Sequence, residues 1–287
     1  METWALIYNP VSGGFRAEAM EAVAAALHTA GVRVRPMPTT RPGHATELAR
    51  EVHGVERVAV YGGDGTLNEA ANGVQGRTLP LVFIPGGTAS VMAHEMGLPR
   101  DPAQAALIQA RAVPRAVHPG LLDNWAFLLM AGVGFDGEAV YRVRPWFKRL
   151  SGKTAYVWSA LEALASSRHP LRAEVPGWEP RLGDWLVAAR SAHYGGAFRI
   201  HPDAGLLKEH LGIVLVGRSS LLTFLALHLG LNRHRDADGI SYTRAHSMRM
   251  DCATPMHAQV DGDYHGAAQK FTIGISPRPV FLCIPEV

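Results

Sequence analysis

The first 120 residues alternate short apolar runs with helical patterns, and a glycine-rich turn follows three of the runs. The predicted strands cover residues 5–8, 32–37, 57–61 and 79–84, and helical spacing covers residues 20–27, 46–52 and 67–72. Alternation of this kind builds a parallel sheet with helices on both faces. Ligands of such sheets bind at the carboxyl ends of the strands, so the three glycine turns should gather at one edge.

After about residue 117 the pattern changes to strands joined by turns. Strands are expected at 125–130, 185–189, 213–216, 248–252 and 257–260, with helices at 154–166 and 221–229. We therefore expect an α/β domain over residues 1–120 and a mainly β domain over 121–287. The last strand, residues 280–284, has two places open to it: the second domain, or a return to the sheet of the first.

Composition narrows the classes of function. The net charge is +3 with 18% charged residues, which suits nucleotides or acidic membranes and excludes the dense basic stripe of a dedicated nucleic-acid binder. Cys252 and Cys283 have no metal-type spacing and form no disulfide framework, which predicts a cytoplasmic protein. We expect no signal peptide and no membrane-spanning segment, so any membrane contact would be peripheral, at the inner face.

The sharpest motif comes after the strand at 57–61 and opens a helix. Glycines let the backbone approach a phosphate closely, and the helix start attracts anions. Within this loop we expect Thr66 to donate a hydroxyl, and Asp64 to orient the nucleotide or hold Mg²⁺ indirectly. A tight strand-to-helix turn is the alternative explanation for the glycines. The candidate nucleotide-binding residues here are Gly62, Gly63, Asp64, Gly65, Thr66 and Glu69.

Two further turns of the same kind favour a phosphate site over a tight turn. One follows the strand at 79–84 and also opens a helix. The other follows the first strand. Their candidate nucleotide-binding residues are Gly86, Gly87 and Thr88 in the former and Asn9 and Ser12 in the latter.

These turns together resemble a known family. The loop at residues 62–66 is similar to the nucleotide loop of diacylglycerol kinases, sphingosine kinases and NAD kinases. Seven other stretches resemble the bacterial diacylglycerol kinase or lipid kinase branch in order along the chain, at 9–13, 72–73, 87–91, 97–99, 132–136, 195–204 and 261–263. The resemblance implies a Rossmann-like N-terminal α/β domain, a C-terminal β-sandwich, an active site in the interdomain cleft, and ATP with Mg²⁺ as cofactors.

The residues that match the family's catalytic groups are altered. Asp263 stands where the family carries a glutamate near the transferred phosphate, and it is one methylene shorter. His118 occupies the place of a family aspartate between the domains, and Asp136 remains as a carboxylate of the cleft. The resemblance also implies a structural Mg²⁺ site at an Asp-Gly pair before a strand, where this chain has Glu209 followed by His210.

The resulting hypothesis is an ATP-dependent kinase that phosphorylates a hydroxyl of a diacylglycerol-like lipid at the membrane surface. Asp263 or His118 would accept the hydroxyl proton. Two alternatives stay open: a nucleotide- or lipid-binding homologue with weak or no catalysis, and NAD kinase-like phosphorylation of a soluble nucleotide. No nucleic-acid partner is expected, and a homodimer is left open.

Three weaker patterns in the sequence suggest other kinds of binding site. The glycines at 132, 134 and 137 have the spacing of a dinucleotide-binding fingerprint, but no second strand–helix unit follows them. Residues 151–154 mimic the end of a phosphate-binding P-loop without its first glycine. The basic, aromatic stretch at 141–153 suits anionic lipid headgroups, although a solvated surface is the simpler account.

Overall fold

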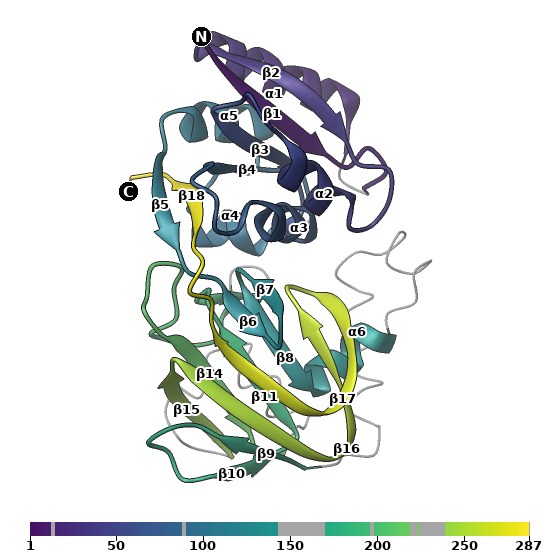
Figure 1. The fold of residues 1–287 in the computed structure, drawn as a ribbon, viewed down its shortest axis with the longest axis vertical. Helices are drawn as coiled ribbons and strands as arrows, with labels where there is room; N and C mark the ends of the chain where they lie inside the picture. Colours follow the sequence, from purple (N-terminus) through teal and green to yellow (C-terminus); the bar gives the residue numbers. More distant parts are fainter. Residues whose placement is uncertain are drawn as a thin grey trace. The chain divides into compact units, whose positions relative to one another are not determined.

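The computed structural model describes residues 1–12, 15–87, 90–142, 170–195, 198–218, 223 and 239–286. The chain divides into two compact units. The first comprises Met1–His118 with Pro277–Val287, and the second comprises Pro119–Ser276 (Figure 1). The helices expected at 154–166 and 221–229 fall outside the described residues, apart from residue 223, and so do 143–153 of the basic stretch.

The first unit is built on a six-stranded sheet flanked by helices. In spatial order its strands are β2 (Val32–Pro38), β1 (Glu2–Tyr8), β3 (Arg57–Gly62), β4 (Leu81–Pro85), β18 (Val280–Ile284) and β5 (Val113–Val117). All neighbouring pairs are parallel except β18 with β5. The C-terminal strand β18, yellow in Figure 1, thus lies between β4 and β5 in this sheet.

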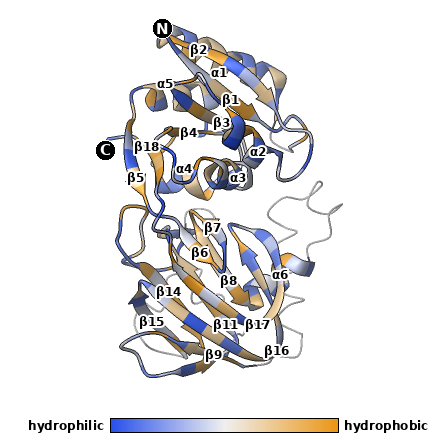
Figure 2. Ribbon diagram, viewed as in Figure 1, coloured by the Kyte–Doolittle hydropathy of each residue, from blue (hydrophilic) through white to orange (hydrophobic). Residues whose placement is uncertain are grey.

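Helices alternate with these strands, as the sequence pattern predicts. They are α1 (Ala17–Thr29), α2 (His44–Glu51), α3 (Asp64–Val74), α4 (Val91–Glu95) and α5 (Pro102–Ala110). The central strand β4 is buried along its whole length, as expected for a parallel strand covered on both faces. Figure 2 shows the hydrophobic residues following the inner strands of the sheet, around a core that includes Trp4, Leu6 and Ile84.

Strand register brings the three glycine turns to one edge of this sheet. Tyr8 at the end of β1 pairs with Tyr61 in β3, and Gly62 pairs with Pro85 at the end of β4. The turns that follow β1, β3 and β4 therefore begin at the same level on adjacent strands. The expectation that they gather at the carboxyl edge is confirmed for the described residues of the turns.

The second unit is mainly β. Its main path of strands is β15 (Ile240–Ala245), β14 (Leu211–Val216), β11 (Trp185–Ala189), β8 (Met130–Gly134), β16 (Ser247–Val260), β17 (Asp263–Ile275), β6 (Gly120–Leu122) and β7 (Trp125–Phe127). Strand β9 (Leu171–Glu174) joins β16 and β10 (Arg181–Gly183), while β12 (His193–Tyr194) pairs with β13 (Phe198–Arg199). The helix α6 (Phe135–Arg142) follows β8, and apolar side chains from the strands form the core. The expected mainly β second domain is confirmed.

Three predicted strands have different bounds. Residues 125–130, expected as one strand, form β7 and the start of β8, with a break at Leu128 and Leu129. Residues 248–252 and 257–260, expected as two strands, belong to the single long strand β16. Its pairing with β17 shifts register between Asp251 and Met256, which is where the sequence reads as interrupted. Among the described residues, no helix is both long and apolar enough to cross a membrane.

Candidate active site

The turns after β3 and β4 lie directly against each other. The backbone nitrogen of Gly86 donates a hydrogen bond of 2.8 Å to the carbonyl oxygen of Gly62. A side chain on Gly86 would collide with the ring of Tyr61, since a Cβ there would lie 2.6 Å from the nearest ring carbon. A Cβ on Gly87 would lie 3.3 Å from the Cα of Gly63. The glycine at 86 is therefore needed for the close approach of the two turns, and a side chain at 87 would be tightly packed against the other turn.

Gly63 is different, because the fold does not require a glycine there. Its backbone is extended, with φ −91° and ψ 177°, a conformation that any residue adopts. A Cβ built at Gly63 would meet no atom within 4 Å. The space beside this residue is open, and it lies at the start of α3, where no described side chain caps the helix. Unbonded N–H groups and the positive end of the helix dipole attract anions at such a position.

Asp64 links the first turn to the helix that follows the second. Its carboxylate accepts hydrogen bonds from the backbone nitrogens of Val91 at 2.8 Å and Met92 at 3.2 Å, and from the hydroxyl of Ser90 at 3.0 Å. Burial raises the pKa of Asp64, and these hydrogen bonds partly offset the effect. The described contacts give Asp64 the role of fixing one turn against the other. Its indirect role toward Mg²⁺ stays a prediction.

Ser90 completes this link. Its hydroxyl accepts a hydrogen bond from the backbone nitrogen of Ala93 and donates one to Asp64, so it caps α4 while joining it to α3. The side chain is buried. Thr66 lies in the first turn of α3, beneath Gly62, while Thr88, the remaining candidate of the second turn, falls outside the described residues.

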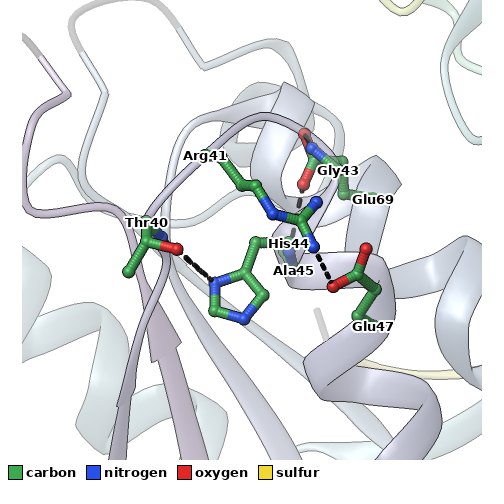
Figure 3. Close-up of polar contacts among 7 residues, drawn as sticks. All are labelled: Thr40, Arg41, Gly43, His44, Ala45, Glu47 and Glu69. Atoms are coloured by element: carbon green, nitrogen blue, oxygen red, sulfur yellow. Dashed lines mark hydrogen bonds and ion pairs between the residues drawn. The ribbon is translucent and has the colours of Figure 1, made fainter.

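Glu69 is directed toward the start of α2 (Figure 3). Its two carboxylate oxygens accept hydrogen bonds from the backbone nitrogens of Gly43 at 2.9 Å and Ala45 at 3.2 Å. The hydroxyl of Thr46 also donates to the carbonyl oxygen of Glu69. The described contacts therefore make Glu69 the cap of a neighbouring helix. A role in nucleotide binding, expected from the sequence, is not needed to explain the residue.

The turn after β1 is stabilised by the side chain of its first residue, Asn9. Asn9 accepts a hydrogen bond from the backbone nitrogen of Val11 at 3.1 Å, an Asx-turn, and the backbone nitrogen of Ser12 donates to the carbonyl of Asn9. Phe15 then stacks on Tyr8 with ring centroids 5.6 Å apart. Asn9 and Ser12 thus shape the third turn at this edge of the sheet.

In the second unit, Asp136 is a buried carboxylate at the start of α6. The hydroxyl of Tyr194 donates to one of its oxygens, and the side-chain nitrogen of Gln259 donates to the other at 2.6 Å. Burial raises the pKa of Asp136, and the two hydrogen bonds act in the opposite direction. The sequence does not single out Tyr194 or Gln259. A polar residue two positions before Asp261 in a buried strand was the available signal.

The turn that leads to Asp263 is held from two sides. Asp261, with φ 49°, accepts hydrogen bonds from the backbone nitrogens of Leu128, Leu129 and Met130 at 2.8–2.9 Å. The side-chain oxygen of Gln259 accepts one from the backbone nitrogen of Gly262 at 2.8 Å. Because Gln259 also donates to Asp136, it connects that carboxylate to the turn that precedes Asp263. Asp263 itself is exposed at the first position of β17.

Two candidate residues are not part of the hydrogen-bonded group of Asp136, Gln259 and Asp261. His118 is the exposed last residue of the first unit, whereas Asp136 and Asp263 belong to the second. Glu209 is exposed in the loop before β14. In the part of the chain that the structure describes, no group of three or more His, Cys, Asp or Glu side chains is arranged to hold a metal ion.

The dinucleotide fingerprint at 132–137 is explained by packing. A Cβ on Gly132 would overlap the Asp136 carboxylate, and one on Gly137 would overlap the backbone of His257. Strand β8 is antiparallel to both β11 and β16, so the parallel strand pair of a dinucleotide fold is missing around it. These glycines let α6 pack closely on the sheet.

An α/β unit with three glycine turns at one edge, joined to a β unit with a rigidly held carboxylate turn, defines a two-domain α/β plus β protein. The chain matches the family described as "Diacylglycerol kinase catalytic domain" over residues 3–121 and "YegS C-terminal NAD kinase beta sandwich-like domain" over residues 130–283. It therefore belongs to the bacterial diacylglycerol kinase and YegS lipid kinase family.

Relatives agree over nearly the full length. The chain is 28% identical to a protein of Bacillus subtilis (strain 168) named "Diacylglycerol kinase", over 91% of this chain and 89% of that protein. It is 29% identical to a protein of Chromohalobacter salexigens named as a YegS-like lipid kinase, over 99% and 94%. A crystal structure from Bacillus anthracis str. Sterne superposes with a TM-score of 0.81 at 21% identity, over 99% of this chain and 95% of that chain, which shows the shared fold.

Proposed function

We propose that this protein is an ATP-dependent lipid kinase that transfers the γ-phosphoryl group of ATP to a hydroxyl of a diacylglycerol-like lipid. The observation that carries the proposal is the open space at Gly63. It lies at an uncapped helix start, beside a second turn in which Gly86 is needed for packing. A glycine that the fold does not need is explained by a phosphate that must approach the backbone.

In this proposal the turns of the first unit hold the phosphates. The N–H groups at the start of α3 would donate to phosphate oxygens, with Thr66 as a further donor. Asp64 and Ser90 would keep the second turn in place beside the first. Mg²⁺, when bound with ATP, would neutralise charge that develops on the transferred phosphoryl group.

The acceptor chemistry is assigned to the second unit. Asp263 is an exposed carboxylate on a turn fixed by Asp261 and Gln259, which suits a general base that removes the proton of the lipid hydroxyl. His118 is the second candidate for this proton. Relatives named as diacylglycerol kinase and as lipid kinase favour a lipid acceptor over the nucleotide acceptor of an NAD kinase.

The proposal is tested by incubating the protein with γ-labelled ATP, Mg²⁺ and vesicles that contain diacylglycerol, phosphatidylglycerol or a sphingoid base, with NAD in a separate reaction. Label in the lipid phase, dependent on one lipid, would support the proposal and identify the acceptor class. Label in NAD instead would establish a nucleotide kinase. Protein that binds ATP without transferring label to any acceptor would establish a binding homologue.

A further inference from the structure

Arg190 is a buried cation that the proposed reaction does not use. It follows β11 directly, and only 1% of its surface is exposed. Its guanidinium donates to the backbone carbonyl oxygens of Leu206 at 2.5 Å, Lys208 at 2.6 Å and His210 at 3.1 Å. Three carbonyls from alternate residues of one loop thus converge on a single positive group.

No carboxylate neutralises this charge among the described residues. The ion pairs of the described chain do not include Arg190, and its Nε has no hydrogen-bond partner there. Burial lowers the pKa of Arg190 to about 10, so the group stays protonated at neutral pH. Carbonyl dipoles alone therefore balance the charge, which is how backbone oxygens also serve hard metal cations.

The loop is the one to which the family resemblance assigns a structural Mg²⁺. The described residues do not fit that ion. Glu209 is exposed, and its neighbours bring no group of three or more metal-ligating side chains. The guanidinium already occupies the point where the carbonyls meet, and a divalent cation there would be repelled by it.

We propose that the guanidinium of Arg190 is the structural cation of the loop at residues 203–210, in the place of a metal ion, and that the folded second unit needs no divalent cation there. Arg suits this role because its planar group presents several fixed donors and always carries charge. The loop then stays ordered whatever the free Mg²⁺ concentration.

The same residue reaches the turn of Asp263 through the backbone. The backbone nitrogens of Arg190 and Ser191 both donate to the carbonyl oxygen of Leu129, at 2.7 and 3.0 Å. The nitrogen of Leu129 in turn donates to Asp261. Arg190 therefore supports both the loop before β14 and the segment on which the carboxylate turn rests.

The first test is thermal unfolding of the wild-type protein without nucleotide, in EDTA and in millimolar Mg²⁺ or Ca²⁺. The melting temperature should be the same under the three conditions, within about 1 °C, because the loop carbonyls already bind the Arg190 guanidinium and leave no site for a metal ion. A saturable rise of several degrees with either metal would overturn the proposal.

The second test compares Arg190→Met with the control Arg172→Met, whose side chain is 56% exposed. Arg190→Met leaves three carbonyls unpaired and should lower the melting temperature by on the order of 5 to 10 °C, whereas the control should change it little. Arg190→Lys keeps the charge and should fall between wild type and Arg190→Met. The proposal would be overturned if Arg190→Met melted at the same temperature as the wild-type protein, or if Arg190→Lys melted no higher than Arg190→Met.

Should Arg190→Met fail to fold, a folded Arg190→Lys protein would still support the role of the charge. If neither variant folds, the metal series on the wild-type protein decides, since it needs no substitution.

Discussion

The carboxylate of Asp64 accepts a hydrogen bond of 2.8 Å from the backbone nitrogen of Val91, so the start of α3 is tied to the start of α4. This bond, with those from Met92 and Ser90, fixes the two glycine turns beside the open space at Gly63. In the proposed kinase, the geometry of the phosphate site therefore depends on a residue that need not touch the nucleotide.

Replacing Asp64 should weaken nucleotide binding by loosening this link. Asp64→Ala removes the acceptor for three donors, so we expect a loss of about 2 kcal/mol in the free energy of unfolding and an ATP affinity at least tenfold lower. Chemical denaturation and isothermal titration calorimetry measure the two effects. The control Ser90→Ala loses one of the three donors and the cap of α4, so it should lower stability but give a smaller loss of ATP affinity than Asp64→Ala. Unchanged ATP affinity in Asp64→Ala would contradict the assignment.

Replacing Glu69 should lower stability but, unlike replacing Asp64, leave ATP affinity nearly unchanged. Glu69→Ala removes the cap of α2 and should cost about 1 to 2 kcal/mol in unfolding free energy. ATP affinity should stay within about twofold, a change well under 1 kcal/mol. Glu47→Ala removes an exposed ion pair with Arg41 and serves as the control, with little effect on stability. A large loss of ATP affinity in a stable Glu69→Ala protein would restore its role at the nucleotide.

The raised pKa of Asp136 predicts a pH dependence of stability. A carboxyl whose pKa is higher in the folded than in the unfolded state favours folding most at low pH. That contribution is lost as the pH rises through the folded pKa. The unfolding free energy of the wild-type protein should therefore fall, relative to that of Asp136→Asn, as pH is raised above about 4, the unfolded pKa. Urea unfolding from pH 4 to 8 gives this difference. A difference that grows in favour of the wild type with rising pH would show that the pKa of Asp136 is lowered instead.

Asp263 is expected to act on the acceptor and not on ATP. Asp263→Ala should lower kcat about 100-fold or more, with little change in ATP affinity, since a general base typically contributes at least that factor. Asp263→Glu keeps the carboxylate and should retain activity, and combined with His118→Asp it should raise turnover. The control is Asp251→Ala, which removes an exposed carboxylate of the neighbouring strand β16. Full activity in Asp263→Ala would move the base to another residue, His118 first.

The inner parallel strands of the first unit could be predicted from sequence because they carry continuous buried apolar runs, as β4 does over its whole length, whereas the edge strand β2 alternates apolar residues with arginines. Breaks within strands could not. Leu128 and Leu129 direct their N–H groups to Asp261, and this long-range contact ends β7. In β16, Pro255 lies within the register shift, so the sequence suggests two strands although the chain continues as one.

The candidate site also has parts that could be predicted from sequence and parts that could not. The glycine turns are local features, and their meeting at one edge follows from strand order. Gln259 and Arg190 act through partners far along the chain or through backbone carbonyls, for which no local pattern exists. Because Glu69 follows the glycine loop, the sequence suggests that it contacts the nucleotide. Its partners are instead backbone groups at the start of α2, which lie near Glu69 only because α2 packs against α3.

In the proposed reaction, the phosphates of ATP approach the backbone at Gly63 before the γ-phosphoryl group passes to a lipid acceptor. The most direct measurement is the initial rate of label transfer from ATP to diacylglycerol in vesicles, for the wild type and Gly63→Ala, with the melting temperature of each. The added methyl group enters open space, so the melting temperature should fall by no more than a few degrees, the effect of alanine in place of glycine at a helix N-cap. The transfer rate should fall at least tenfold, equivalent to about 1.4 kcal/mol. A Gly63→Ala protein that transfers label at the wild-type rate, or a wild-type protein that labels no lipid, would contradict the account.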